Sequence, residues 1–211
     1  MNKEIFEQKQ KRAMQILRRL KKAYPNVGIV LNYKTPMQLL AAVILSAQAT
    51  DNQVNKLTKE LFKKYKSVGD FAEADLQKFT HEVSKVNFYK NKAKYIVGSA
   101  KKIRDEYGGK LPHSIDGITQ LPGVARKTAN IVLREIYGVV EGIAVDTHVK
   151  RVATNLGFTN QKNPDKIEQD LMKLFPKKEW GNVSFLFQAY GRTAMPARGK
   201  PKIPDPLLRW Y

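Results

Sequence analysis

The feature that most constrains the fold of this chain is a series of amphipathic segments, each bounded by residues that start or stop a helix. Apolar side chains recur in them at spacings of three and four residues, the period of an α-helix and not of a strand. No stretch alternates polar and apolar residues as a half-buried strand does. The sequence therefore predicts an all-α fold. The expected helices cover residues 3–23, 35–47, 51–62, 91–107, 114–120, 125–137, 146–156, a segment starting at 163–164, and 178–194, and several short helices are expected within residues 70–86.

Capping residues mark several of these boundaries. Thr35, Asp51 and Ser114 stand where a side-chain oxygen can accept a hydrogen bond from the free N–H groups of a first turn. Gly138 stands where a helix ends, because glycine adopts a left-handed backbone at little cost. Residues 196–206 carry four prolines, which block helix formation, so we expect this segment to be extended.

The charge of the chain indicates a polyanionic partner. There are 38 Lys plus Arg against 19 Asp plus Glu, a formal net charge of +19. A positive field of this size attracts nucleic acid first of all, although a generally basic protein or one that binds membrane surfaces is the alternative. The prolines of residues 196–206 alternate with basic residues, so this segment either contacts a phosphate backbone or is simply a solvated end.

Several classes of site and location are excluded or disfavoured. The sequence has no cysteine, which excludes disulfides, thiolate zinc sites and cysteine-ligated iron–sulfur clusters. The three histidines show no metal-ligand spacing, so we expect no transition metal. The longest apolar run, Leu39–Leu45, is far shorter than the roughly 20 residues of a membrane span, and no signal peptide precedes it. We expect a soluble, cytoplasmic protein.

Residues 121–129, Leu-Pro-Gly-Val-Ala-Arg-Lys-Thr-Ala, have the composition of a tight turn between a short and a longer helix. Pro-Gly forces the turn, and Gly123 allows another backbone to approach closely. The turn opens onto a helix N-terminus, where free N–H groups and the helix dipole favour an anion. Leu121 and Val124 would anchor it in the core. The segment predicts a phosphate clamp that ignores base sequence, with a plain corner between two helices as the alternative.

Lys127 lies in the first turn of the helix that follows. It precedes Ala129 by two residues, so at about 100° per residue its side chain points away from the apolar stripe. The helix dipole and the adjacent Arg126 both disfavour a protonated amine there, and the neutral amine is the nucleophilic form. An ordinary solvated surface lysine is the alternative. The expected stripe consists of Ala129, Val132, Leu133 and Ile136.

Four segments, Leu45–Asp51, Leu121–Ala129, Ala144–His148 and Tyr190–Arg192, resemble the endonuclease III family of helix-hairpin-helix DNA glycosylases, in its order and at close to its spacing. The resemblance extends over roughly residues 30–195. It implies two helical domains with a DNA-binding cleft between them. Residues 29–141 would form a six-helix domain carrying the helix-hairpin-helix motif, and residues 1–28 with 142–211 would form the second domain.

The resemblance also implies an activity. The family counterpart of Lys127 is the catalytic nucleophile, which makes the chain a bifunctional DNA glycosylase with AP lyase (β-elimination) activity. Retention of that lysine favours oxidised pyrimidines such as thymine glycol as substrates. Asp146 matches the carboxylate that stabilises positive charge on the sugar and assists proton transfer. It also suits the N-cap of the next helix, and the two roles are compatible if only one carboxylate oxygen caps.

The same resemblance identifies candidate DNA contacts. A target base must leave the duplex, and Gln48 would then fill the gap opposite the widowed base while Phe88 acts as an apolar wedge. The alternatives are a helix-end amide for Gln48 and a core residue for Phe88. The remaining candidates, from the hairpin and the later motifs, are Leu121, Gly123, Val124, Ala125, Arg126, Thr128, His148, Arg151, Arg192, Arg198 and Lys200.

Two departures from the family pattern stand out. The cluster-binding cysteines of the family would fall near Met195, Lys202, Asp205 and Tyr211, none of which supplies a thiolate. We therefore expect no cofactor, and expect the proline-rich segment to pack instead through Leu207, Leu208 and Trp210. Ala125 stands where the hairpin usually has a second glycine; its methyl group either crowds the phosphate or costs nothing if φ is negative.

Two other functions are compatible with the same residues. One is a monofunctional glycosylase for mismatched uracil or thymine, which would use water in place of Lys127. The other is a non-catalytic helix-hairpin-helix DNA-binding protein, which the presence of both Lys127 and Asp146 disfavours. In each case the expected partner is double-stranded DNA. For an enzyme, that DNA would contain damaged bases or abasic sites. We expect a monomer, located in the cytoplasm and associated with the nucleoid through DNA.

Overall fold

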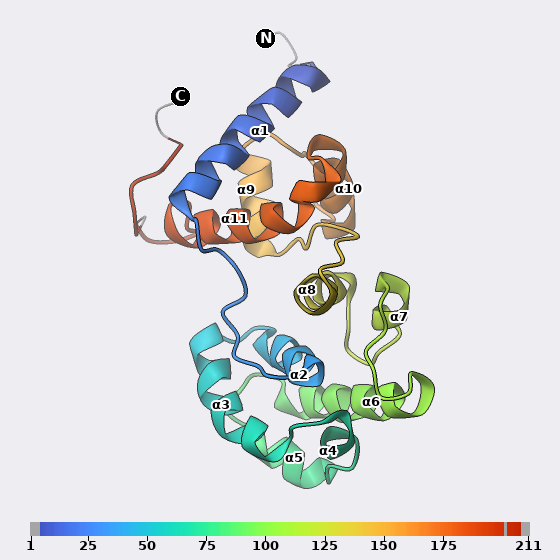
Figure 1. Ribbon diagram of the computed structural model, residues 1–211. Coiled ribbons are helices and arrows are strands. Elements are labelled where there is room, and N and C mark those ends of the chain that lie inside the picture. The colour runs from blue at the N-terminus through green and yellow to red at the C-terminus, as the bar shows by residue number, and fades with distance from the viewer. Residues whose placement is uncertain (1–4, 201, 208–211) are drawn as a thin grey trace. The chain divides into compact units, whose positions relative to one another are not determined.

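The structure, a computed structural model, describes residues 5–200 and 202–207 (Figure 1). Its regular elements are eleven α-helices and one 3-10 helix, and these residues include no strand, so the all-α prediction is confirmed. The chain divides into two compact units. We call residues 30–139 the hairpin unit and residues 1–29 with 140–211 the terminal unit. The domain expected from the sequence, residues 29–141, starts one residue before the hairpin unit and ends two residues after it.

The hairpin unit is built around α2, which is buried along almost its whole length because nearly every residue in it is apolar. Helices α3, α6 and α8 pack against α2, while α4 and α5 pack on α6 and α7 packs on α8. The helices of this unit are α2 (Pro36–Ser46), α3 (Asp51–Lys64), α4 (Val68–Ala72), α5 (Leu76–Glu82), α6 (Tyr89–Glu106), α7 (Ile115–Thr119) and α8 (Arg126–Tyr137).

The short helices expected over residues 70–86 correspond to α4 and α5, and with both of them the hairpin unit has seven helices, one more than the six that the resemblance implies. Ser67 caps α4 in a capping box with Asp70, and Asp75 caps α5 by accepting from the Lys78 N–H.

The start of α3 differs from the expectation. Thr50, not Asp51, is the N-cap of α3, so the Asp51 carboxylate lies in the first turn, where the helix dipole favours a negative charge.

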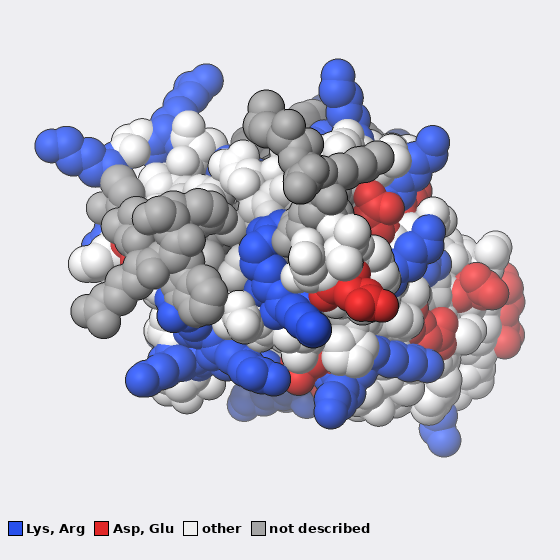
Figure 2. All heavy atoms as spheres, turned by 90° about the horizontal axis from the view of Figure 1, so that it is seen from above, with Lys and Arg blue, Asp and Glu red and all other residues white. Residues whose placement is uncertain are grey.

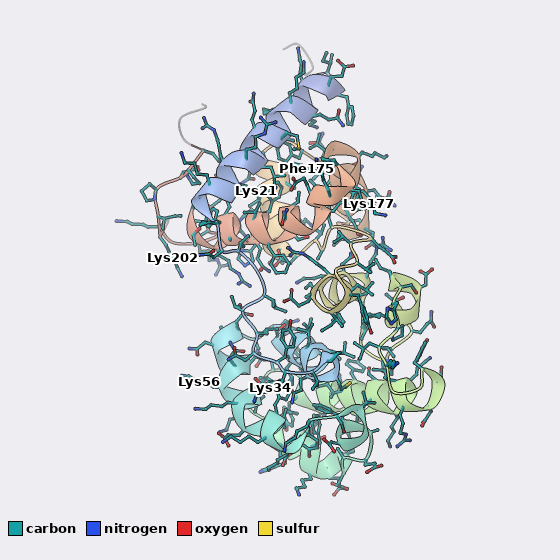
Figure 3. The ribbon with its side chains drawn as sticks, viewed as in Figure 1. Lys21, Lys34, Lys56, Phe175, Lys177 and Lys202 are labelled. Carbon is teal, nitrogen blue, oxygen red and sulfur yellow. The ribbon has the colours of Figure 1, made fainter. Side chains whose placement is uncertain are left out.

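The terminal unit joins both ends of the chain around one core. α11 packs against α9 and α1, and α10 contacts both α9 and α1. Phe158, Phe175 and Phe187 form an aromatic cluster in this core, with ring centroids 5.9–6.0 Å apart; Phe175 is labelled in Figure 3. The elements are α1 (Phe6–Ala23), α9 (Thr147–Asn155), α10 (Pro164–Leu174), the 3-10 helix η1 (Lys177–Glu179) and α11 (Trp180–Thr193).

Residues 194–200 and 202–207, which follow α11, form neither helix nor strand, and hydrogen bonds and packing hold them on the terminal unit. The N–H of Lys202, labelled in Figure 3, donates to the Thr193 carbonyl at 2.7 Å. The hydroxyl of Tyr190, which is 1% exposed, donates to Asp205 Oδ2 at 2.9 Å, and Asp205 Oδ1 accepts from the Leu207 N–H at 2.8 Å. Leu207 packs into the core as expected, whereas Leu208 and Trp210 lie outside the described residues.

Candidate nucleic-acid interface and active site

The predicted hairpin turn lies between α7 and α8 in the hairpin unit. Gly123 has φ +72°, and a Cβ added there would run into the Tyr95 ring, so this position requires glycine. The Val124 N–H donates to the Leu121 carbonyl at 3.2 Å, and Ser99 Oγ donates to the Pro122 carbonyl at 3.0 Å. The turn is thus fixed from within and also from α6.

The side chains of Leu121 and Val124 are buried, at 2% and 6% exposure, which confirms their role as anchors of the turn. It also restricts their predicted DNA contact to the backbone, because a buried side chain cannot reach a phosphate. Ala125 is the N-cap of α8 with φ −85° and ψ 165°. This extended backbone suits any residue, so the alanine in place of a second glycine brings no conformational cost.

Lys127 is the second residue of α8 and is exposed. On the opposite face Ala129, Val132 and Leu133 are buried as expected, while Ile136 is half-buried. The helix has no acidic residue in its first turn. An anion drawn to the N-terminus of α8 therefore meets the exposed Lys127 beside it, although the nucleophilic role of the amine stays a prediction.

The other two polar residues of this first turn, Arg126 and Thr128, are exposed and half-buried, respectively. Arg126 adds a second exposed cation directly after the turn. Both positions suit the DNA contact expected of them, and that contact also stays a prediction.

Asp146 is half-buried and divides its carboxylate between two tasks in the terminal unit. Oδ1 caps α9 by accepting from the N–H groups of His148 and Val149, both at 2.8 Å. Oδ2 accepts from the side chain of Gln188 on α11 at 2.6 Å. One carboxylate oxygen alone therefore serves as the cap, which is the condition under which capping and a catalytic role are compatible.

His148 and Arg151, both predicted DNA contacts, are half-buried and joined to each other. Arg151 Nη2 lies 3.0 Å from His148 Nδ1 and donates to the Gly191 carbonyl at 2.6 Å, while its Nε donates to the Met195 carbonyl at 3.0 Å. Burial lowers the pKa of His148; Asp146 opposes this shift and Arg151 adds to it. Arg151 thus links α9 to the end of α11 by hydrogen bonds, which is a structural role. Its contact with DNA stays a prediction.

Gln48 and Phe88 lie at the ends of helices and are both exposed, Phe88 to 61%. The alternative of a core residue is therefore wrong for Phe88. Each has a left-handed backbone, with φ 54° for Gln48 and φ 57° for Phe88. Such a backbone costs about 1–3 kcal/mol in a residue other than glycine, and it clusters at functional sites.

Basic side chains are widespread on the surface. Figure 2 shows Lys and Arg projecting over most of the face drawn, whereas Asp and Glu gather in fewer places. Arg192, Arg198 and Lys200, the candidates near the C-terminal end of the terminal unit, are all exposed. Exposure makes them available to a phosphate backbone, and their contact with DNA stays a prediction.

The places of the family's cluster ligands do not suit an iron–sulfur cluster. Asp205 is hydrogen-bonded as described above, Lys202 is exposed, and Met195 Sδ accepts from the Asn155 side chain at 3.3 Å. None is a thiolate, and residue 211 lies outside the described part. Across residues 5–200 and 202–207, no group of three or more His, Asp or Glu side chains could hold a metal ion.

Sequence reasoning missed three side chains that contact Asp146, Gln48 or the backbone just before Gln48. Gln188 accompanies Asp146 from 42 positions away, and its only sequence signal is a polar residue within the apolar run of α11. Asn87 donates to the Gln48 carbonyl at 3.0 Å, and Lys92 donates to the carbonyls of Leu45 and Ala47. These pairings depend on how the helices pack, so no local pattern reveals them.

Within the described residues, no helix is long and apolar enough to span a membrane.

Comparison with known proteins gives a consistent assignment. The family model for HhH-GPD superfamily base excision DNA repair proteins matches residues 41–177. Endonuclease III of Synechocystis sp. is 46% identical over 190 residues, which cover 90% of this chain and 87% of that protein.

Two solved structures are similar along nearly the whole chain. A non-covalent endonuclease III–DNA complex has a TM-score of 0.86 at 37% identity, covering 90% of this chain and 89% of the other. A trapped endonuclease III–DNA covalent intermediate has a TM-score of 0.87 at 36% identity, covering 93% of both chains. The chain therefore belongs to the HhH-GPD superfamily of base excision DNA repair proteins, and within it to the endonuclease III family.

Proposed function

We propose that this protein is a bifunctional DNA glycosylase and AP lyase of base excision repair. The observation that carries the proposal is the exposed Lys127 in the first turn of α8, directly after the hairpin turn. Backbone N–H groups at a helix N-terminus bind a DNA phosphate without regard to sequence. A neighbouring amine is then well placed to attack the sugar of a flipped nucleotide. The solved complexes of endonuclease III with DNA support the same partner for this chain.

The chemistry proceeds in two stages. Lys127 Nζ attacks C1′ as the C1′–N bond to the damaged base breaks, and the base leaves with the electron pair and takes up a proton. Asp146 stabilises the positive charge that builds on the sugar. The bound amine then loses one proton, and the C1′–O4′ bond of the sugar breaks as O4′ takes up a proton, which leaves a protonated Schiff base between C1′ and Lys127. The Schiff base acidifies C2′, and loss of a C2′ proton expels the 3′ phosphate and breaks the strand.

We further propose the finer features of this function. The substrates are oxidised pyrimidines such as thymine glycol in double-stranded DNA, together with abasic sites. The enzyme acts as a monomer on nucleoid DNA in the cytoplasm. It works without an iron–sulfur cluster, because the sequence has no cysteine to bind one.

Borohydride trapping tests this function. Duplexes carrying thymine glycol or an abasic site are incubated with wild-type protein and with Lys127→Ala, and the Schiff base is reduced to a stable adduct. We expect an adduct and base release with wild type and none with Lys127→Ala, because alanine has no amine. Lys101→Ala, which removes an exposed cation from α6, is the matched control and should trap normally.

The other outcomes distinguish the remaining functions. Base release without strand cleavage or adduct would mean a monofunctional glycosylase that uses water. DNA binding without base release, cleavage or adduct would mean a non-catalytic DNA-binding protein. Trapping on the abasic duplex alone would keep the lyase and overturn thymine glycol as its substrate.

A further inference from the structure

Gln48 and Phe88 share a backbone conformation found at no other non-glycine residue of the described chain. L residues rarely adopt positive φ, and they keep it only where the surroundings fix the backbone. Each residue lies next to a helix: Gln48 comes two residues after the end of α2, and Phe88 is the N-cap of α6. Both are also the residues expected to enter the DNA duplex. The contacts that hold their backbones therefore bear on function.

The end of α2 is held partly from outside the helix. The last four carbonyls of a helix have no partner within it, so other donors must satisfy them. Lys92 on α6 supplies the donor for Leu45, with Nζ 2.8 Å from its carbonyl oxygen. The other three carbonyls have nearby donors: Val43 accepts from Ser46 Oγ, Ile44 from the Ala47 N–H and Ser46 from the Ala49 N–H.

Lys92 is an unusual residue to find at this place. It is only 4% exposed, and Nζ also donates to the Ala47 carbonyl at 2.6 Å. Burial lowers the pKa of Lys92, which reflects the cost of removing a cation from water. The negative end of the helix dipole offsets part of that cost, and α2 has no basic residue of its own in its last turn. Lys92 thus fixes the backbone on the N-terminal side of Gln48.

Asn87 fixes Gln48 itself. Its Nδ2 donates to the Gln48 carbonyl at 3.0 Å, so the residue before Phe88 is bonded directly to the other inserted residue. A further bond, from Gln53 Nε2 on α3 to the Lys85 carbonyl at 2.5 Å, ties the loop that contains Phe88 to the start of α3. One bond therefore joins the loop of Phe88 directly to Gln48, and the other joins it to α3, the helix that follows Gln48.

We propose that Asn87 and Lys92 are positioning residues that clasp Gln48 and Phe88 into one insertion unit, which enters the duplex as a single preformed body. The inference rests on the proposed DNA glycosylase function. Insertion of two separately mobile loops would require both to be ordered on binding, and preorganisation removes that cost. Phe88 then separates the base steps while Gln48 takes the space opposite the widowed base.

Asn87→Ala tests the clasp without touching the core, because Asn87 is exposed. Asn91→Ala, also exposed and in the first turn of α6, is the matched control. Strand cleavage is measured on an abasic site in a duplex and on the same site in a single strand. Only the duplex requires insertion, whereas both substrates require Lys127.

We expect Asn87→Ala to slow duplex cleavage about five- to tenfold, the effect of losing one hydrogen bond, with single-strand cleavage unchanged. Asn91→Ala should match wild type on both substrates. A 2-aminopurine placed opposite a tetrahydrofuran abasic analogue provides a spectroscopic readout, because its fluorescence rises when the orphan base is unstacked. This rise should be smaller with Asn87→Ala than with Asn91→Ala at saturating protein.

Lys92→Met is the second variant. Because two carbonyls lose their donor, it should unfold at a lower temperature, and its duplex-to-single-strand ratio should fall as for Asn87→Ala. Equal duplex rates and equal fluorescence in Asn87→Ala and wild type, with normal single-strand cleavage, would overturn the clasp alone. A wild-type protein that cleaves and traps neither substrate would overturn the proposed function, and the clasp with it.

Discussion

At the scale of single residues, Asp146 shows how one carboxylate can serve both folding and chemistry. Oδ1 satisfies two N–H groups at the start of α9, and Oδ2 accepts from Gln188. The cap depends on an oxygen acceptor and not on charge, whereas stabilising a cationic sugar depends on charge. The two roles can therefore be separated by a substitution that keeps the shape and removes the charge.

Asp146→Asn should fold almost as stably as wild type and lose turnover. The asparagine Oδ1 retains the cap, and Gln188 can turn to present its carbonyl to the new amide, so we expect less than about 1 kcal/mol of lost stability. Base release under single-turnover conditions should slow on the order of a hundredfold or more, because the charge that stabilises the sugar cation is gone.

Asp146→Ala is the matched comparison for this substitution. It removes the cap as well, and should lose about 1 kcal/mol of unfolding free energy in addition to activity. Full turnover by Asp146→Asn would show that the carboxylate is only a helix cap.

At the scale of elements, the hairpin is shaped as much by α6 as by its own sequence. Ser99 on α6 holds the Pro122 carbonyl, and the Tyr95 ring lies against Gly123 where a Cβ would be. The glycine thus meets two requirements at once, a positive φ and a close approach to another helix. Gly109 has φ +77° with open space around it, so it meets only the first.

Gly123→Ala should therefore destabilise the protein more than Gly109→Ala. A left-handed alanine alone costs about 1–2 kcal/mol, which is the expected loss for Gly109→Ala. Displacement of Tyr95 should bring the loss for Gly123→Ala to about 2–4 kcal/mol. Urea denaturation of both variants measures the difference. Affinity for undamaged duplex DNA should fall only with Gly123→Ala, and equal losses in both would mean that Tyr95 gives way at no cost.

At the scale of the whole molecule, side-chain contacts hold the C-terminal segment at the positions where the family resemblance would imply a cluster. Asp205 links this segment to Tyr190 in the core, and Leu207 is buried in the same core. These contacts need no metal. They also keep the basic residues Arg198 and Lys200 on a segment attached at both ends.

We expect purified protein to contain no iron or acid-labile sulfide, and its thermal stability to be insensitive to iron chelators. Asp205→Ala should lower the unfolding free energy by about 1–3 kcal/mol, because the Tyr190 hydroxyl loses its acceptor in a buried place. Glu141→Ala, which removes an exposed carboxylate from the same unit, should change stability little. Stoichiometric iron, or an Asp205→Ala protein as stable as wild type, would contradict this account.

The sequence by itself determined the helical class, most helix boundaries and the hairpin turn, because these depend on local chemistry. Capping side chains at Thr35, Ser114 and Asp146 and the glycine at 138 act within one turn of the helix that they bound. The motif residues, Lys127 among them, are likewise contiguous in sequence. The predicted N-cap of α3, Asp51, is one position too late. Thr50 and Asp51 can both cap a helix, and local chemistry alone does not choose between them.

Only the tertiary structure decided which distant side chains support the candidate residues. Gln188 reaches Asp146 from α11, Lys92 reaches the end of α2 from α6, and Tyr95 closes on Gly123. The exposure of Phe88 was equally undetermined, since an aromatic residue before a helix can pack inward or outward. Such pairings are set by the packing of whole helices, which depends on many weak contacts and leaves no mark at a fixed spacing in the sequence.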